Sequence, residues 1–556
     1  MSFFELNIGS YGLFAAQQGL SITSNNIANS NTTGYSRQVL TQTAGRPLRG
    51  AGVGMIGTGV NVTGIERIRN SYLDTKMWSQ KPMLGEYRVK SEQSALIEGV
   101  FGEPSDVGFT TIFNDFFNSL DALSKIPDEG ERKVGMMQTM KSFTQYFNST
   151  SSSLEKYQRD LNFEVKNKVD EINIITRRLE SLNKQIYQAE MHGGTANSLR
   201  DERELQIDRL SELVNVDAKE YEVVGETGKP EKRYSVKLNG QPLVDHFDSR
   251  ELDVKVRTDK NNPRDVEGLY DVVWKDGLSF KMNDSSLSGE LKGAIDMRDG
   301  NANATDIATG QEPYNYRGIP YYIQRLDKFV QDFAKSLNDV YGEGVNEEGE
   351  TGSFLFGAGD NLADPVAREA LSKAITDAAA AEAARLGRDL TDKEKADVKN
   401  NTTSKFYRDS FAADPDFYKK NFTASNFSVN QEILDDPSSI RTTTHPDKAP
   451  GGNDLILDLM EQKHNRKMFK EGEPNDYMIS IFSELGINAK EAKMYSNSQS
   501  NMVNAIENQR LSVSQVSQNE EMVSLVKYQQ AYQAAARIIS TMDTIYDITI
   551  NRLGIS

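Results

Sequence analysis

The two ends of this 556-residue chain carry its clearest helical patterns, and the less regular segments lie between them. Near the amino terminus, leucine or isoleucine recurs every seven residues, with a small residue at the intervening step. The apolar positions are Leu6, Leu13, Leu20 and Ile27, and the small ones are Gly9, Ala16 and Thr23. This spacing is typical of an amphipathic helix that packs against another helix. The sequence therefore predicts a long first helix that ends near Asn29.

A second helical pattern runs from about Ser496 to the end of the chain. One stripe alternates steps of three and four residues through Met522, Leu525, Gln529, Tyr532, Ala536, Ile539, Asp543, Tyr546, Ile550 and Leu553. A further apolar stripe follows Val526, Ile538, Met542, Ile545 and Ile548. A helix that is apolar on two faces must be buried on two faces. We expect the first helix to cover one stripe, a neighbouring copy to cover the other, and the helix to break within 512–519.

Between the ends the hydrophobic period changes several times. Heptad spacing from Leu154 to Glu190, a glycine turn and another helix predict an antiparallel hairpin. Residues 219–290 alternate polar and apolar and contain Asn239-Gly240, which favours a hairpin turn, so an inserted antiparallel β domain is expected there. Helical spacing then returns over 291–359.

An alanine-rich helical insertion is expected at 360–420. Asp364-Pro365 predicts a helix start, and Thr391 with Glu394 predicts a capping box. The fold class expected is α+β: a coiled-coil-like rod of terminal helices, a helical body, a β insertion and a small helical insertion that decorates the surface. The segments are 1–70 pairing with 496–556, then 71–218, 219–290, 291–359, 360–420 and 421–495.

Composition excludes several functions. The net charge of −17 argues against sequence-independent nucleic-acid binding, which needs a surplus of Lys and Arg. The absence of cysteine removes disulfides, thiolate metal sites and cysteine nucleophiles. The sequence contains no run of eighteen apolar residues, so no membrane-spanning helix is expected. The first residues lack the basic and apolar regions of a secretory signal.

The chain shows no motif that predicts catalysis, a cofactor or a metal. Residues 52–57 match G-x-G-x-x-G, but breakers precede them and a β-like run follows, so a loop is expected. The four histidines, His192, His246, His445 and His464, occur singly and without metal-ligand spacing. No G-x-S-x-G or Walker motif is present. A non-enzymatic protein is therefore expected.

Two further motifs stand beside the terminal helices. Residues 26–38 read Asn-Ile-Ala-Asn-Ser-Asn-Thr-Thr-Gly-Tyr-Ser-Arg-Gln, and residues 525–539 read Leu-Val-Lys-Tyr-Gln-Gln-Ala-Tyr-Gln-Ala-Ala-Ala-Arg-Ile-Ile. The pair resembles the terminal motifs of the bacterial flagellar axial proteins, and Thr-Gly-Tyr-Ser-Arg-Gln is most similar to the members that join hook and filament. The matching residues are Asn26, Ala28, Asn29, Gly34, Tyr35 and Arg37 at the start, and Leu525, Tyr528, Gln529, Tyr532, Ala534, Ala535, Ala536 and Ile539 at the end.

The resemblance implies a structural subunit in a helical layer between flagellar hook and filament. It implies contacts with copies of itself, with the hook protein below and the second junction protein above, and with an export chaperone at the C-terminal helix. It also implies an extracellular location after export from the cytoplasm without a cleaved signal. We expect Gly34 to permit a turn, Asn26 and Asn29 to cap the helix end, and Tyr532 and the alanines to pack in the helix seam.

Three alternatives stay open. A hook or distal-rod subunit would share both termini but less of Tyr35-Ser36-Arg37-Gln38. A cytoplasmic coiled-coil adaptor would make the pairing of the two motifs a coincidence. An enzyme displayed on such a scaffold would need catalytic motifs that the sequence lacks.

Overall fold

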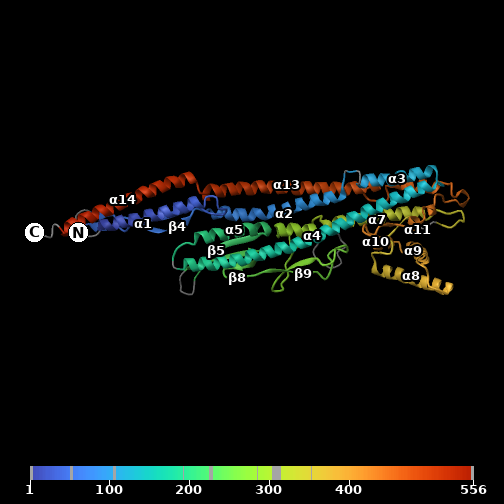
Figure 1. Ribbon diagram of the computed structural model, residues 1–556, viewed down its shortest axis with the longest axis horizontal. Coiled ribbons are helices and arrows are strands. Elements are labelled where there is room, and N and C mark those ends of the chain that lie inside the picture. The colour runs from blue at the N-terminus through green and yellow to red at the C-terminus, as the bar shows by residue number, and fades with distance from the viewer. Residues whose placement is uncertain are drawn as a thin grey trace.

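The protein is elongated, with both termini at one end (Figure 1). The structure is a computed structural model and describes residues 4–50, 54–103, 105, 108–191, 193–224, 230–284, 286–302, 315–351 and 354–551. Long helices run along the molecule, and small antiparallel sheets lie against them. The expected α+β class is confirmed. Within the described residues, no helix combines the length and apolarity that crossing a bilayer requires.

The terminal helices pack on each other at one end of the molecule. Helix α1 spans Phe4–Ala28 and α14 spans Gln518–Asn551, and they run antiparallel (Figure 1). Next to them, α2 (Ser71–Phe101) packs along α13 (Pro474–Ser514). The C-terminal helical segment thus begins at Pro474, earlier than expected, and breaks at 515–517, inside the expected interval.

The helical body contains the main core. Helices α3 (Phe109–Lys125), α4 (Gly130–Glu190), α5 (Asn197–Leu213), α6 (Glu290–Asp299) and α7 (Ile319–Tyr341) contribute to it. Stacked rings join α4 and α7, since the centroids of Phe147 and Phe329 are 5.2 Å apart. Helix α4 begins well before the heptad segment because Met136, Met140 and Phe143 continue its buried face.

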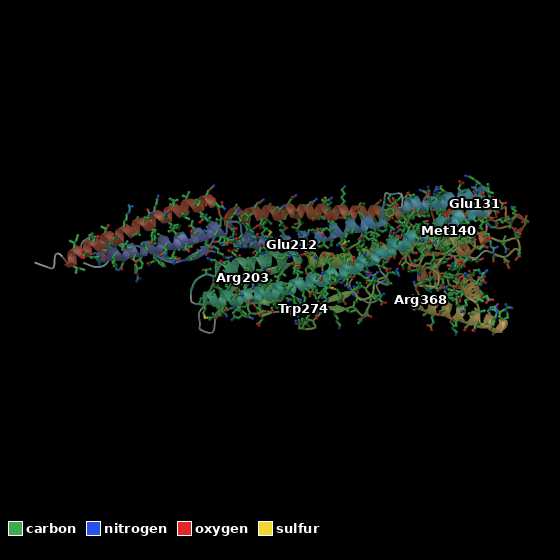
Figure 2. The ribbon with its side chains drawn as sticks, viewed as in Figure 1. Glu131, Met140, Arg203, Glu212, Trp274 and Arg368 are labelled. Atoms are coloured by element: carbon green, nitrogen blue, oxygen red, sulfur yellow. The ribbon has the colours of Figure 1, made fainter. Side chains whose placement is uncertain are left out.

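The β insertion consists of two small antiparallel sheets. Four strands pair in the order β5 (Val216–Val224), β6 (Pro230–Leu238), β7 (Gln241–Asp245) and β8 (Asp248–Ser249), and β9 (Leu252–Val256) pairs with β10 (Tyr270–Trp274). Asn239 and Gly240 have φ of 48° and 78°, which suits the expected two-residue hairpin turn. Arg203 of α5 is labelled in Figure 2. Its guanidinium carbon lies 3.7 Å from the centre of the Tyr234 ring on β6.

Two small antiparallel sheets of two strands each follow α1. β1 (Gln38–Ala44) pairs with β4 (Val60–Arg67), and β2 (Leu48–Gly50) pairs with β3 (Gly54–Ile56). Residues 52 and 53 of the glycine-rich motif lie outside the described residues. Its described part, β3, is followed by a strand, and the next helix begins only at Ser71, so the dinucleotide arrangement is not formed.

The insertion at 360–420 is less separate than expected. Helix α8 (Pro365–Leu386) begins at the Asp364 cap, α9 (Asp392–Ala413) begins at the Thr391–Glu394 capping box, and α10 (Phe417–Asn421) follows. Helix α8 is mostly exposed, but Tyr407 and Phe417 are buried in the main core. The expectation of a pure surface decoration is therefore wrong for the last part of the insertion.

The remaining elements are β11 (Phe356–Gly357), β12 (Ser428–Val429), α11 (Gln431–Asp435), α12 (Asp454–Glu461) and three short 3-10 turns, Pro437–Ser439, Pro446–Lys448 and Gln462–His464.

Candidate assembly interface

Glycines of α1 allow the two terminal helices to approach closely. A Cβ at Gly19 would lie 2.4 Å from Cε1 of Tyr528, and one at Gly9 would lie 3.0 Å from Cγ1 of Ile539. Gly12 faces Ala535 at a looser 3.9 Å. Gly9, early in α1, faces Ile539, and Gly19, later in α1, faces the earlier residue Tyr528, so the two helices run antiparallel along this seam. Small residues, rather than large apolar ones, set its spacing.

The seam follows only the small positions of the expected heptad pattern. Gly9, Ala16 and Thr23 are buried, whereas Leu6, Leu13, Leu20 and Ile27 are only partly buried; Ala15 and Ile22, outside the pattern, are buried as well. On α14, Ala535 is buried, and Leu525, Tyr528, Ala536 and Ile539 are partly buried. Gln529, Tyr532 and Ala534 are exposed, as are Ala28, Met522, Asp543 and Ile550. The assignment of Tyr532 and Ala534 to the seam is therefore wrong, and Leu553 lies outside the described residues.

The second stripe of α14 is largely uncovered. Val526, Ile538, Ile545 and Ile548 are exposed, with fractions between 42% and 47%, while Met542 is partly buried. Tyr11 and Phe14 of α1 are also exposed. A monomer thus leaves a row of large apolar side chains in water on its terminal pair. An extended exposed apolar surface of this kind marks an interaction site.

A joint connects the terminal pair to the body. Helix α13 ends at Ser514, α14 begins at Gln518, and Val516 between them is buried. The backbone amide of Arg37 donates to the carbonyl of Ser514 at 2.9 Å. The loop that follows α1 therefore packs against the break between the two C-terminal helices.

The Arg37 side chain holds the far side of the same break. Its Nε donates to Glu521 at 2.8 Å, and its Nη1 donates to Glu520 at 3.0 Å. Glu521 is 3% exposed and also accepts from Nδ2 of Asn26 at 3.0 Å. Both contacts satisfy a carboxylate that would be costly to bury alone. Its place in the first turn of α14 also suits the helix dipole.

Asn26 and Tyr35 complete the joint. The Asn26 side chain donates to the carbonyl of Gln38 at 2.8 Å and accepts from the Gln38 amide at 3.1 Å. Tyr35 donates its hydroxyl to Asn26 at 2.8 Å. Burial, together with Asp201 and Glu521, raises the pKa of Tyr35 to about 12, so the hydroxyl stays protonated as a donor. Asn26 therefore links the loop to α14 instead of capping α1.

The other two motif residues have local roles. Asn29 donates from Nδ2 to the carbonyl of Asn25 at 3.0 Å, which satisfies a group at the end of α1. Gly34 has φ of 81°, a left-handed conformation that glycine adopts without strain, and it faces Leu205 of α5.

An ion-pair network anchors the joint to the body. Asp201 of α5 accepts from the Ser36 hydroxyl at 2.7 Å and from Arg67 at 2.7 Å. Arg67 and Arg69 also bind Glu204 at 2.9 Å each. Burial acts to raise the pKa of Glu204, but Arg69 and Arg67 hold that pKa below its ordinary value. The Glu204 carboxylate is thus kept charged.

Sequence reasoning missed the acidic half of this site. The sequence alone does not show that Glu521 and Asp201 bind Arg37 and Ser36, because acidic residues are abundant and these partners lie far away in sequence. A usable signal did exist: residues 6–36 contain no Asp, Glu, Lys, Arg or His, although charged residues make up 26% of the chain. Among the described residues, no group of three or more His, Cys, Asp or Glu side chains is placed to hold a metal ion.

Comparison with known proteins agrees with this arrangement. The family described as "Flagellar hook-associated protein FlgK helical domain" matches residues 94–356. Two other families match only the ends: "Flagella basal body rod protein" at residues 6–35 and "Flagellar basal body rod FlgEFG protein C-terminal" at residues 507–553. The two end matches cover most of α1 and α14.

Full-length relatives carry one common name. The chain is 28% identical to "Flagellar hook-associated protein 1" of Bacillus subtilis, over 100% of this chain and 99% of that protein. It is 25% identical to the protein of the same name from Escherichia coli, over 98% and 99% of the two chains. A solved structure, "The structure of the flagellar hook junction protein FlgK from Burkholderia pseudomallei", aligns with a TM-score of 0.40 and 20% identity, over 51% of this chain and 46% of that one.

The two terminal helices pack on each other, and each lies in a segment that matches a rod-type family. Together with the separate helical middle, these features define a flagellar axial protein. Among the flagellar axial proteins, the match of the middle segment and the names of the full-length relatives point to the hook-associated proteins. Over its full length the chain is similar to proteins named flagellar hook-associated protein 1.

Proposed function

We propose that the protein is a structural subunit of the bacterial flagellum that forms the junction between hook and filament. It assembles helically through α1 and α14. The observation that carries this proposal is the terminal pair itself, since one face of α14 packs on α1 and the other leaves Val526, Ile538, Ile545 and Ile548 exposed. Neighbouring subunits cover this second face in the polymer.

The family matches favour a junction subunit over a hook or distal-rod subunit. Rod-type families match only the two ends, which such proteins share. The hook-associated family matches 94–356, a range that includes α4 with its heptad segment. The full-length relatives carry the same hook-associated name. A coiled-coil adaptor or a displayed enzyme receives no such support.

The remaining parts of the proposal concern partners and location. The subunit contacts copies of itself, the hook protein on one side and the second junction protein on the other. Before assembly, an export chaperone shields the apolar stripe of α14, and the chain leaves the cytoplasm without a cleaved signal peptide. The protein acts without catalysis, cofactor or metal.

The role of the seam can be tested with two matched substitutions in α1. Gly19→Ala places a Cβ within 2.4 Å of the Tyr528 ring, whereas Gly12→Ala places one at 3.9 Å from Ala535. Both changes raise helix propensity by the same amount, so only the seam distinguishes them. Overpacking costs about 1–3 kcal/mol. In cells that lack the native gene, we expect Gly12→Ala to restore filaments and Gly19→Ala to reduce them strongly.

Secreted and cellular amounts of each variant must be measured, so that loss of export is separated from loss of assembly. Mass spectrometry of isolated flagella should find the native protein there, and immunogold labelling should place it between hook and filament. Absence from flagella would refute the proposed function. Full assembly of Gly19→Ala would refute only the role of the seam.

A further inference from the structure

The second half of α13 presents an outward face without charge. Met494, Ser498, Met502, Ala505, Gln509 and Val513 follow steps of three and four residues, so they share one side of the helix. All of them are exposed, and Met494 is 59% exposed. We call these six residues the neutral face. Every residue from 494 to 513 is described by the structure.

The charges of this segment lie on the opposite side of α13. Its two charged residues are Glu507 and Arg510. Arg510 points into the molecule, where it binds Asp74 at 3.2 Å and Asp208 at 2.9 Å, and Glu507 lies 3.6 Å from Arg510. The neutral face itself therefore carries no charge, while Glu507, on another side of the helix, is partly exposed.

Exposed helix faces elsewhere in the protein look different. On α4, the outward positions include Arg177, Arg178 and Lys184, and on α8 they include Arg385. This pattern is what solubility requires of a surface that stays in water. Long apolar residues mixed with uncharged Ser, Asn and Gln instead resemble the core of a protein interface, where charged residues are depleted.

The neutral face also continues the exposed stripe of α14. The two helices follow one another along the same edge of the molecule (Figure 1), with only residues 515–517 between them. Residues 511–519, which cross the joint, contain no charged residue either. The uncharged surface thus extends from the terminal pair onto the body.

We propose that the neutral face of α13 is a second contact between copies of this chain. This inference rests on the proposed function and extends the interface beyond the terminal helices. Continuity identifies the occupant: the neutral face adjoins the exposed α14 stripe, which neighbouring copies cover in the proposed assembly. Since each copy carries −17, an uncharged contact also adds no like-charge repulsion between copies.

Crosslinking tests the contact directly. The chain has no cysteine, so Ser498→Cys introduces its only thiol. The variant carries a benzophenone maleimide, and flagella assembled from it are irradiated. We expect a product of two copies of the 62.1 kDa chain, with crosslinked peptides from this sequence only. Absence of a product, or crosslinks only to a different protein, would overturn the proposal.

A charge substitution provides the second test and has a control on the same helix. Ser498→Glu places a carboxylate in the neutral face, whereas Ser483→Glu places one on the exposed surface of α13 outside it. Circular dichroism should show that both variants fold like the native chain. We expect at least a tenfold loss of junction assembly for Ser498→Glu and little change for Ser483→Glu.

The result separates this inference from the proposed function. If Ser498→Glu assembles normally while Gly19→Ala fails, the neutral face is not an interface and the terminal-helix assembly stands. If the native protein is absent from flagella, the proposed function fails, and this inference fails with it.

Discussion

Arg37 and Glu521 form an ion pair of 2.8 Å although 484 residues separate them in the sequence. The pair joins the loop after α1 to the first turn of α14, on the far side of the break in the C-terminal helices. Since the Arg37 amide also binds Ser514, one residue contacts both sides of the break. The angle between the terminal pair and the body therefore depends on the Arg37 position.

Replacing Arg37 by Gln should loosen the joint. Glu521 would remain buried with Asn26 as its remaining side-chain donor, and an under-satisfied buried group costs about 1–3 kcal/mol. We expect faster hydrogen exchange in the first turns of α14 and faster proteolysis near residues 515–517. The control Arg385→Gln removes an exposed pair with Glu382 and should change stability by less than about 0.5 kcal/mol. Equal exchange in both variants would contradict the role given to Arg37.

The terminal pair should be the least stable helical part of the monomer. Apart from Ile22, the buried apolar residues described in the pair are alanines, Ala15, Ala16 and Ala535, and the α14 stripe stays in water. Helices gain most of their stability from tertiary burial, and ordering each residue costs roughly 1–2 kcal/mol of backbone entropy. Hydrogen exchange of a verified monomer should be faster in α1 and α14 than in α4 and α7. In isolated flagella the difference should disappear, and protection of both termini in the monomer would contradict this expectation.

Tyr407 should be essential to the body although it lies in the 360–420 insertion. Its ring centroid is 4.8 Å from that of Phe354, and its hydroxyl donates to the carbonyl of Gly359 at 2.8 Å. Tyr407→Ala leaves a large cavity and should cost about 3–5 kcal/mol in urea unfolding. Val366→Ala, at a residue of α8 that is 75% exposed, should cost less than about 0.5 kcal/mol. Complete removal of 360–420 should therefore destabilise the body, which removal of a segment that only decorates the surface would not do.

His246 should make the β insertion sensitive to acid. It is 8% exposed, and neither ring nitrogen has a hydrogen-bond partner. Burial and the nearby Arg233 and Arg203 lower the pKa of His246, while Glu231 and Asp245 act in the opposite direction. As the pH falls through the ordinary histidine pKa, the unfolded chain binds a proton that the folded chain does not, so stability decreases.

His246→Asn should flatten this decrease between pH 7.5 and pH 5.5, as measured by urea unfolding. Asparagine has no titrating ring and tolerates the φ of 54° at this position. His464→Asn removes an exposed histidine paired with Glu473 and should leave the decrease in place. An unchanged slope in His246→Asn would show that the proton is taken up elsewhere.

Local chemistry determined much of the fold. The Asp364 cap, the Thr391–Glu394 capping box and the Asn239-Gly240 turn lie where the sequence placed them, because each depends on residues a few positions apart. The terminal helices and the break between α13 and α14 follow from hydrophobic spacing in the same way. The second stripe of α14 could be read from the sequence, since helix geometry alone sets which residues share a face.

Only the tertiary structure decided which side of α1 meets α14. Heptad spacing predicted a stripe of Leu6, Leu13 and Leu20 with Gly9, and Gly9 does face Ile539. The closest approach between two helices depends on both surfaces, however, and Gly19, which lies outside that stripe, meets Tyr528. The Arg37–Glu521 pair and the burial of Tyr407 likewise depend on contacts between distant segments. Sequence periodicity reports which faces are apolar, whereas the choice among possible partners is made by packing and by the need to satisfy buried charge.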